Sequence, residues 1–180
     1  LIQHNRPGTP LRPTSVTVHN TANPDTTAQN NRDYFSSHPA AQVSAHYVVD
    51  DTEAIRCIPE DEVAWHAGQA ANGSSLSVEV CEFTDPARQA VADRNAAWLV
   101  ADILTRYGWG IEQIRTHHDW TGKDCPRKLL PMWGEFISMI EREMEPMIRF
   151  PDVPNDHWAR AVIETAAAQG WVGGFEDGTF

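Results

Sequence analysis

Three side chains in this sequence could bind one metal ion, although they lie far apart along the chain. His19 ends an apolar run, and the pair His117-His118 precedes Cys125 by eight and seven residues. Imidazole nitrogens and a thiolate are ligands that zinc accepts, and three of them leave its fourth tetrahedral position free for water. A structural zinc usually has four protein ligands, often from a C-x-x-C pair, which this sequence lacks. The pattern therefore favours a catalytic zinc and metal-assisted hydrolysis.

The residues alone do not decide which histidine of the pair is the ligand. Adjacent residues in an extended segment point to opposite faces, so only one of His117 and His118 can readily face the metal. His19 taken by itself is more typical of a buried structural histidine. Cys125 changes that interpretation. It lies in a polar loop, where a cysteine is hard to explain as a buried apolar side chain.

Glu79 is a second candidate for chemistry. It lies between Val78 and Val80 in a strand-like run, and an acid inside an apolar run needs a reason. A solvent-facing strand position is one explanation, which would also suit the nearby Glu82. A position beside the metal is the other.

The elements that must position these residues alternate between strands and helices. Apolar and β-branched runs predict strands at residues 16–18, 43–50, 54–58 and 75–83, with a hairpin turn at Asp50-Asp51. Apolar residues at three- and four-residue steps predict helices at about 26–37, 86–107 and 129–144. Asp25 or Thr26 would cap the first helix, and Gly108 would end the second. We expect an α/β domain with a central mixed β-sheet flanked by helices.

Composition and charge limit the classes of partner. Of the 180 residues 41% are hydrophobic and 22% charged, as in ordinary globular proteins, and the formal charge is -11. A negative chain opposes binding to nucleic acid and anionic membranes, so no nucleic-acid partner is expected. No apolar run reaches membrane-spanning length. The start at Leu1, without a signal-peptide pattern, suggests a processed or trimmed chain. A monomer is favoured.

Two other cysteines lie in strand-like runs. We interpret Cys57 and Cys81 as small buried thiols, with a disulfide between them as the alternative.

The composition changes after Glu145. The remaining residues begin with a proline-rich loop, continue in a predicted short helix at about 157–169 and end in glycine-rich turns. We therefore expect one domain over 1–145 and a separate linker and small helical segment over 146–180.

Five motifs together resemble a known family. "VTVHNTA", "SAHYVVDD", "EVAWHAG", "SLSVEV" and "THHDWTGKDCP" follow the order and approximate spacing of the type-2 N-acetylmuramoyl-L-alanine amidases, which include phage endolysins and peptidoglycan recognition proteins. The resemblance covers roughly residues 10 to 140. It implies the fold predicted above and zinc-dependent hydrolysis of the amide between N-acetylmuramic acid and L-alanine in peptidoglycan.

The resemblance also implies roles for individual residues. The ligands of one zinc would be His19, His117 and Cys125, with His118 pointing away. Glu79 would accept a proton from zinc-bound water, and Lys123 would stabilise the tetrahedral oxyanion.

Further roles are less specific. His66 would contact the substrate, and His46 would be a buried hydrogen-bonding residue. Asp119 and Asp124 would orient ligands or be exposed loop acids. Some members have a tyrosine where this chain has Ala45, so any role of that tyrosine would pass to Glu79 or another group.

The C-terminal segment resembles the first half of an S-layer homology repeat, a module that anchors proteins to cell-wall polymers. This implies a secreted or cell-wall-associated enzyme of a Gram-positive bacterium, or a phage lysin released from the host cytoplasm. The alternatives are a peptidoglycan-binding protein without turnover, whose members typically lack the cysteine ligand, and an adhesion module with a structural zinc.

Overall fold

The computed structural model describes residues 1–144, 150–154 and 156–180. Contacts divide the chain into two compact units, Leu1–Met144 and Glu145–Phe180. The predicted boundary between residues 145 and 146 lies outside the described residues. Within the part of the chain that the structure describes, no helix is long and apolar enough to cross a membrane.

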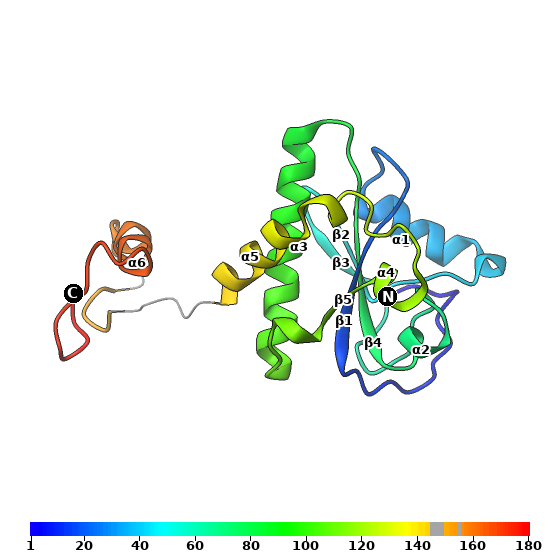
Figure 1. The fold of residues 1–180 in the computed structure, drawn as a ribbon, viewed down its shortest axis with the longest axis horizontal. Coiled ribbons are helices and arrows are strands. Elements are labelled where there is room, and N and C mark those ends of the chain that lie inside the picture. The colour runs from blue at the N-terminus through cyan, green and yellow to red at the C-terminus, as the bar shows by residue number, and fades with distance from the viewer. Residues whose placement is uncertain (145–149, 155) are drawn as a thin grey trace. The chain divides into compact units, whose positions relative to one another are not determined.

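A five-stranded sheet forms the centre of the first unit (Figure 1). Its order is β3-β2-β4-β1-β5, and all neighbouring pairs are parallel except β2 with β3. The predicted mixed sheet is therefore confirmed. The strands are β1 (Ser15–Asn20), β2 (Tyr47–Val49), β3 (Ala54–Arg56), β4 (Ser75–Val80) and β5 (Ile114–Thr116).

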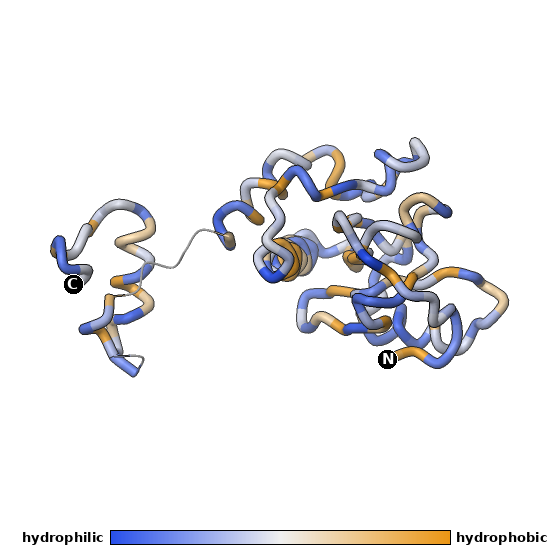
Figure 2. The backbone as a smooth tube through the Cα atoms, turned by 90° about the horizontal axis from the view of Figure 1, so that it is seen from below, coloured by the Kyte–Doolittle hydropathy of each residue, from blue (hydrophilic) through white to orange (hydrophobic). Residues whose placement is uncertain are grey.

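Helices cover both faces of this sheet. Helices α3 and α5 pack together on one side, whereas α1, α2 and α4 lie on the other (Figure 1). In Figure 2, which looks along α3, hydrophobic residues recur among its turns. The helices of the first unit are α1 (Ala28–Ser37), α2 (Gln69–Asn72), α3 (Pro86–Tyr107), α4 (His117–Thr121) and α5 (Trp133–Met144). Three short 3-10 helices are η1 (Pro39–Ala41), η2 (Ile111–Gln113) and η3 (Leu130–Met132).

The two central strands, β1 and β4, have one apolar and one polar face. Successive side chains of a strand point to opposite faces, and the parallel register places His19 beside Glu79. The apolar face carries Val16, Val18, Leu76, Val78 and Val80, which join the core that includes α3. The polar face carries Ser15, Thr17, His19, Ser75, Ser77 and Glu79. The polar face therefore offers the chemically useful side chains.

Most predicted boundaries are close to the observed ones, and local chemistry explains the differences. Thr27, rather than Asp25 or Thr26, caps α1, because its hydroxyl accepts a hydrogen bond from the Asn30 amide. Gly108 ends α3 in the left-handed conformation (φ 66°), as predicted. The predicted helix at 129–144 begins as the 3-10 helix over Leu130–Met132, and the α-helix itself starts at Trp133.

The predicted strand at 43–50 is much shorter in the structure. Residues before Tyr47 bond to a neighbouring loop instead of the sheet: the Ser44 amide donates to the Trp65 carbonyl at 2.9 Å. Cys57 and Cys81 are buried free thiols, which confirms that interpretation. The second unit contains α6 (Arg160–Ala168) within the predicted helical segment.

Candidate metal centre

His19 comes from the polar face of the sheet. It is the fifth residue of β1, its side chain is almost fully buried, and the sheet register pairs it with Glu79 on β4. Burial lowers the pKa of His19 well below its usual value, and the neighbouring His66, His117 and Lys123 lower it further. The imidazole is therefore neutral, the form that binds a metal.

His117 is the first residue of α4. Thr116 caps this helix, because its hydroxyl accepts the Asp119 amide at 3.0 Å while the Asp119 carboxylate accepts the Thr116 amide at 2.7 Å. His117 is buried and His118 is exposed. The segment was expected to be extended; instead it starts a helix, because the capping pair at Thr116 and Asp119 nucleates a turn there. The structure also gives Asp119 a clear role, since its contacts fix the start of α4.

Cys125 lies in the loop that follows α4. Gly122 ends the helix in the left-handed conformation (φ 76°), and the loop returns so that the Cys125 carbonyl accepts the His118 amide at 2.9 Å. This contact holds the loop against the start of α4. Cys125 is buried, whereas Asp124 beside it is exposed.

These three residues form one buried cluster. One ligand atom from each of His19, His117 and Cys125 lies within 4.8 Å of the others. His19 Nδ1 is 3.1 Å from His117 Nδ1 and 3.7 Å from Cys125 Sγ. Usual zinc–ligand lengths in a tetrahedron separate two nitrogens by about 3.3 Å and a nitrogen from a sulfur by about 3.6 Å. The donor set and its spacing therefore fit a zinc ion.

Burial raises the pKa of the Cys125 thiol to about 11, although the Asn20 backbone and Lys123 act in the opposite direction. A cation is needed to make this buried thiol a thiolate at neutral pH. The cluster therefore needs a bound cation if Cys125 is to act as a thiolate ligand.

His66 lies directly against the cluster. Its Nδ1 is 3.0 Å from His19 Nε2, and the Asn72 side chain accepts its backbone amide at 2.8 Å. A hydrogen bond to the second ring nitrogen of a ligating histidine fixes the orientation of the ring. Burial, followed by the influence of His46, lowers the pKa of His66 to about 3, so it is a neutral acceptor for His19. No pattern in the sequence indicated this contact.

His46 is fully buried on the same side of the sheet. Its Nδ1 accepts the Ser77 amide at 2.9 Å, and its Nε2 lies 2.8 Å from the Glu62 carbonyl, to which it donates. Burial lowers its pKa to about 4. The expectation of a buried hydrogen-bonding residue is confirmed.

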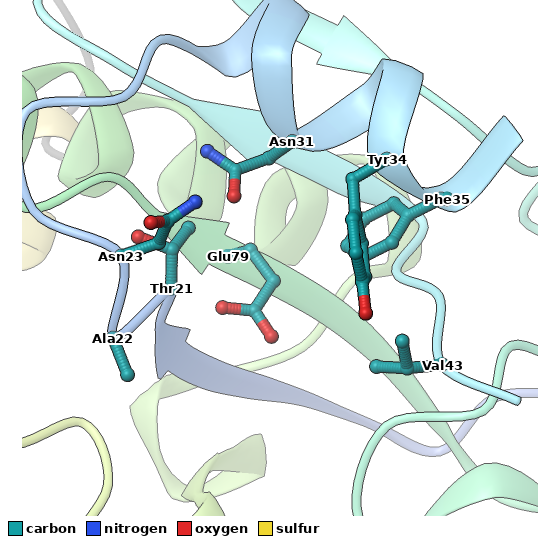
Figure 3. Close-up of a pocket in the computed structure, with 8 residues that line it drawn as sticks. All are labelled: Thr21, Ala22, Asn23, Asn31, Tyr34, Phe35, Val43 and Glu79. Atoms are coloured by element: carbon teal, nitrogen blue, oxygen red, sulfur yellow. The ribbon is translucent and has the colours of Figure 1, made fainter. Parts of the chain in front are cut away.

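Glu79 borders a pocket beside the cluster. Figure 3 shows its carboxylate between the β1–α1 loop, at Thr21 and Asn23, and Tyr34 of α1. The pocket has a volume of about 390 Å³. The Oε2 atom of Glu79 is buried and has no hydrogen-bond partner among the described residues. Burial raises the pKa of Glu79 to about 7, against the effect of the Lys123 charge. A carboxylate with this pKa can accept or donate a proton near neutral pH.

A second pocket, of about 500 Å³, is lined by Trp65, His66, Gly68 and Asn72, and by Gln42 and Val43. Val43 also lines the pocket of Glu79, so the two pockets adjoin. Lys123 is exposed near the cluster, and its charge lowers the pKa values of His19, His117 and Glu79. The structure thus brings together every predicted site residue at one end of the sheet.

Fold and site define an α/β domain with a buried cluster of three donors, spaced to fit a metal ion, beside a pocket that a carboxylate lines. Residues 9–128 match the model of the N-acetylmuramoyl-L-alanine amidase family, and the chain belongs to this family. Residues 149–180 match the S-layer homology domain. The match to each model agrees with the two resemblances seen in the sequence.

Individual relatives agree with this assignment. The N-acetylmuramoyl-L-alanine amidase CwlA of Bacillus subtilis is 36% identical over 145 residues, which cover 77% of this chain and 53% of that protein. The chain therefore spans about half the length of this curated relative. The catalytic domain of XlyA superimposes with a TM-score of 0.70 at 38% identity, covering 76% of this chain and 91% of that domain. A mutant endolysin from Bacillus subtilis gives 0.72 at 36% identity, covering 78% and 95%.

Proposed function

We propose that the first unit is a zinc-dependent amidase that cleaves the amide between N-acetylmuramic acid and L-alanine in peptidoglycan. The observation that carries the proposal is the buried cluster of His19, His117 and Cys125, which would hold the zinc. The spacing of its donor atoms suits a tetrahedral metal, and the carboxylate of Glu79 lines the pocket beside it. The family to which the chain belongs supports the choice of bond.

A bound zinc would polarise the scissile carbonyl and lower the pKa of water. Glu79 then removes a proton from the attacking water, because its carboxylate faces the pocket and its Oε2 has no hydrogen-bond partner among the described residues. The same carboxyl group returns the proton to the departing alanine nitrogen. The Lys123 ammonium group stabilises the negative charge that develops on the carbonyl oxygen.

His66 serves this site in two ways in our proposal. It accepts a hydrogen bond from His19 and so orients that ligand, and it forms a wall of the adjoining pocket, where it would contact substrate. Cleavage would release the stem peptide from the glycan strand.

Purified full-length chain incubated with cell walls tests the proposal. Mass spectrometry should detect free stem peptides with an N-terminal L-alanine and intact glycan strands, and the protein should contain one zinc. The Lys123→Ala variant should keep its zinc and have a lower kcat. Binding to walls without release of peptide would instead indicate a peptidoglycan-binding protein, and zinc without either property would indicate a structural metal.

We further propose that residues 1–145 form the catalytic domain and that residues 146–180 form a linker and a partial S-layer homology segment that holds the enzyme at the cell wall. The match to the S-layer homology domain supports this. Such an enzyme would act at the cell surface or as a lysin. A chain ending at residue 144 should hydrolyse soluble muropeptides like the full chain but sediment less with intact walls. Loss of muropeptide hydrolysis would contradict this division.

A further inference from the structure

Glu82 is a buried acid for which the proposed reaction has no use. It lies two residues beyond the end of β4, and the sequence would suit a solvent-facing side chain. The structure contradicts that expectation, because the Glu82 side chain is 0% exposed. A buried carboxylate is stable only when it is paired and hydrogen-bonded, so its partner explains its position.

The partner is Arg127, which reaches Glu82 from the loop after α4. Arg127 Nε donates to Glu82 Oε1 at 2.8 Å and to Oε2 at 3.1 Å, and Arg127 Nη2 also contacts Oε2. This arrangement uses the planar fork of the guanidinium group, which fixes direction as well as distance. The pair therefore fixes the loop at a defined point beside β4.

Arg127 lies two residues after Cys125, and the next residue adds two more contacts. The Lys128 amide donates to Asn20 Oδ1 at 2.9 Å, and its ammonium group donates to the Phe83 carbonyl at 3.0 Å. Asn20 directly follows His19 in β1. The segment that carries Cys125 is thus tied to the ends of the two strands that carry His19 and Glu79.

The Cys125 sulfur itself has only weak contacts. It lies 3.7 Å from His19 Nδ1 and 3.9 Å from the Asn20 carbonyl, and the loop before it, at Lys123 and Asp124, is exposed. Sulfur contacts of this length do not fix a side chain to within a few tenths of an ångström. Backbone contacts on both sides must supply that precision: the Cys125 carbonyl accepts the His118 amide on the α4 side, and the segment after Cys125 is held through Arg127 and Lys128.

We propose that the Glu82–Arg127 ion pair is a positioning element that sets the place of the Cys125 sulfur relative to His19 and His117, and thereby the zinc affinity of the site. The inference rests on the proposed function, because it takes the three residues as zinc ligands. Interactions one step removed from a metal typically change its affinity by about 10- to 100-fold. Glu82 and Arg127 do not bond to a ligand side chain but act through the backbone of the Cys125 loop, so we expect an effect at the lower end of this range.

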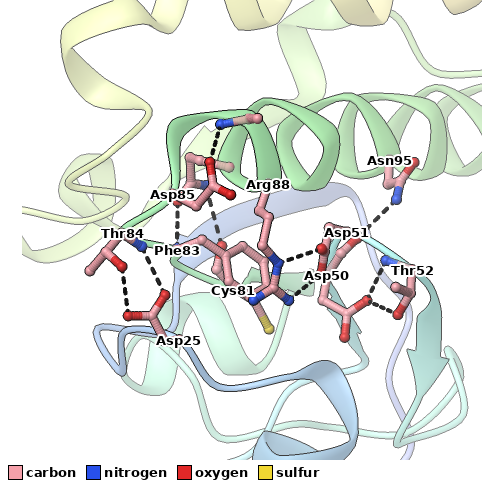
Figure 4. Close-up of polar contacts among 12 residues, drawn as sticks. Asp25, Asp50, Asp51, Thr52, Cys81, Phe83, Thr84, Asp85, Arg88 and Asn95 are labelled. Atoms are coloured by element: carbon pink, nitrogen blue, oxygen red, sulfur yellow. Dashed lines mark hydrogen bonds and ion pairs between the residues drawn. The ribbon is translucent and has the colours of Figure 1, made fainter.

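A second ion pair of the same kind provides a matched control. Arg88 donates to Asp51 at 2.7 and 2.9 Å, and Figure 4 shows that this pair joins the β2–β3 turn to the start of α3. The exposed fractions of the two arginine side chains are similar, 41% for Arg88 and 44% for Arg127. The Arg88 pair does not join the loop of Cys125 to another element. Asp51→Ala removes this pair but keeps the Arg88 guanidinium over the Phe83 ring, 3.9 Å from its centroid, and should therefore leave the zinc site unchanged.

The test measures zinc affinity of the full chain by competition with a chromophoric chelator. Arg127→Ala should weaken zinc binding about tenfold. Arg127→Lys, which keeps the charge but not the fork, should weaken it less, and Asp51→Ala should stay within twofold of the unsubstituted chain. With cobalt in place of zinc, Arg127→Ala should also weaken the thiolate-to-cobalt absorption band, which a general loss of stability would not change in folded protein.

Arg127→Ala leaves a buried unpaired carboxylate and can lower folding stability, so the double variant Glu82→Gln/Arg127→Ala is measured beside it. This variant removes both the tether and the charge, and the same loss of zinc affinity is expected. Affinity within twofold of the unsubstituted chain in the double variant, with an unchanged cobalt spectrum, would overturn the inference and leave the proposed function intact. An unsubstituted chain that binds no zinc would overturn both.

Discussion

The two faces of strands β1 and β4 carry different side chains on one backbone. On the apolar face, Val18 and Val78 pack into the core with α3 and contribute through apolar packing alone. On the polar face, His19 and Glu79 sit side by side in positions where burial disfavours their charged forms. The two faces of the sheet therefore have different functions: one stabilises the fold, and the other holds polar groups in position for chemistry.

The polar face is stabilised by hydrogen bonds instead of apolar contact. Thr17 Oγ1 lies 2.7 Å from Ser75 Oγ and accepts the Trp120 indole hydrogen at 2.9 Å, so α4 is bonded to β1. Buried polar groups in such networks are costly when one partner is lost. Substitutions on the two faces should therefore have different consequences, which can be measured separately.

Loss of a proposed ligand should give the largest effect on the polar face. Cys125→Ala and His117→Ala should lose the zinc and reduce hydrolysis to background, because two remaining ligands hold the metal poorly. Metal analysis and a muropeptide assay check this. His118→Ala is the matched control, since His118 is exposed and should be dispensable. Zinc lost from His118→Ala but kept by His117→Ala would reverse the assignment.

Glu79→Gln should separate metal binding from catalysis. The amide keeps the size of the side chain but cannot accept a proton from water, so kcat should fall on the order of 100-fold or more. Zinc content should stay at one per chain. Turnover equal to that of the unsubstituted enzyme would show that Glu79 has only a structural role in the strand.

A substitution on the apolar face should do the opposite. Leu76 is fully buried in the core, and Leu76→Ala should lower the free energy of unfolding by about 3 kcal/mol through lost burial and a residual cavity. Below the melting temperature, zinc content and kcat should remain close to those of the unsubstituted chain. A parallel fall in kcat for folded protein would show that the two faces are coupled.

The last expected effect is confined to pH values below about 6.5 and concerns the pH dependence of stability. The pKa of His46 is lowered from 6.5 to about 4 in the folded chain, so the unfolded chain binds more protons between these pH values. Stability contributed by neutral His46 is therefore complete above about pH 6.5 and is lost as the pH falls toward 4. Denaturant titrations of metal-free protein should show this loss, and His46→Gln should reduce it. His118→Gln, at an exposed position, should leave the pH profile unchanged.

Much of this protein could be predicted from local sequence. The long helix α3 has the predicted ends because Pro86 and Gly108 act through their own backbone conformations. The strands were located because β-branched runs have few alternatives. The strand at 43–50 is shorter than predicted because the Ser44 amide bonds to a loop and the His46 ring, not its backbone, accepts the Ser77 amide of β4. The site residues were predicted from the order and spacing of motifs that resemble the family, and the match to the family model agrees with that resemblance.

Other features depended on contacts between distant segments. Glu82 and Arg127 are separated by 45 residues, and nothing within either segment shows that they meet. The same holds for His66, whose ring lies against His19 only because the loop before α2 folds over the polar face. A residue's type limits what it can do, but its partners are set by packing.

The mixed α/β class, the family and the side chains available for chemistry could therefore be predicted from the sequence alone, because they follow from residue type, periodicity and motif order. The packing of distant segments then sets which groups are desolvated and which neighbours they gain. That choice raises the pKa of Glu79 to about 7, makes His66 a neutral acceptor for His19 and buries Glu82 against Arg127. Desolvation and pairing depend on the whole fold, because they are set by every segment that packs around a group.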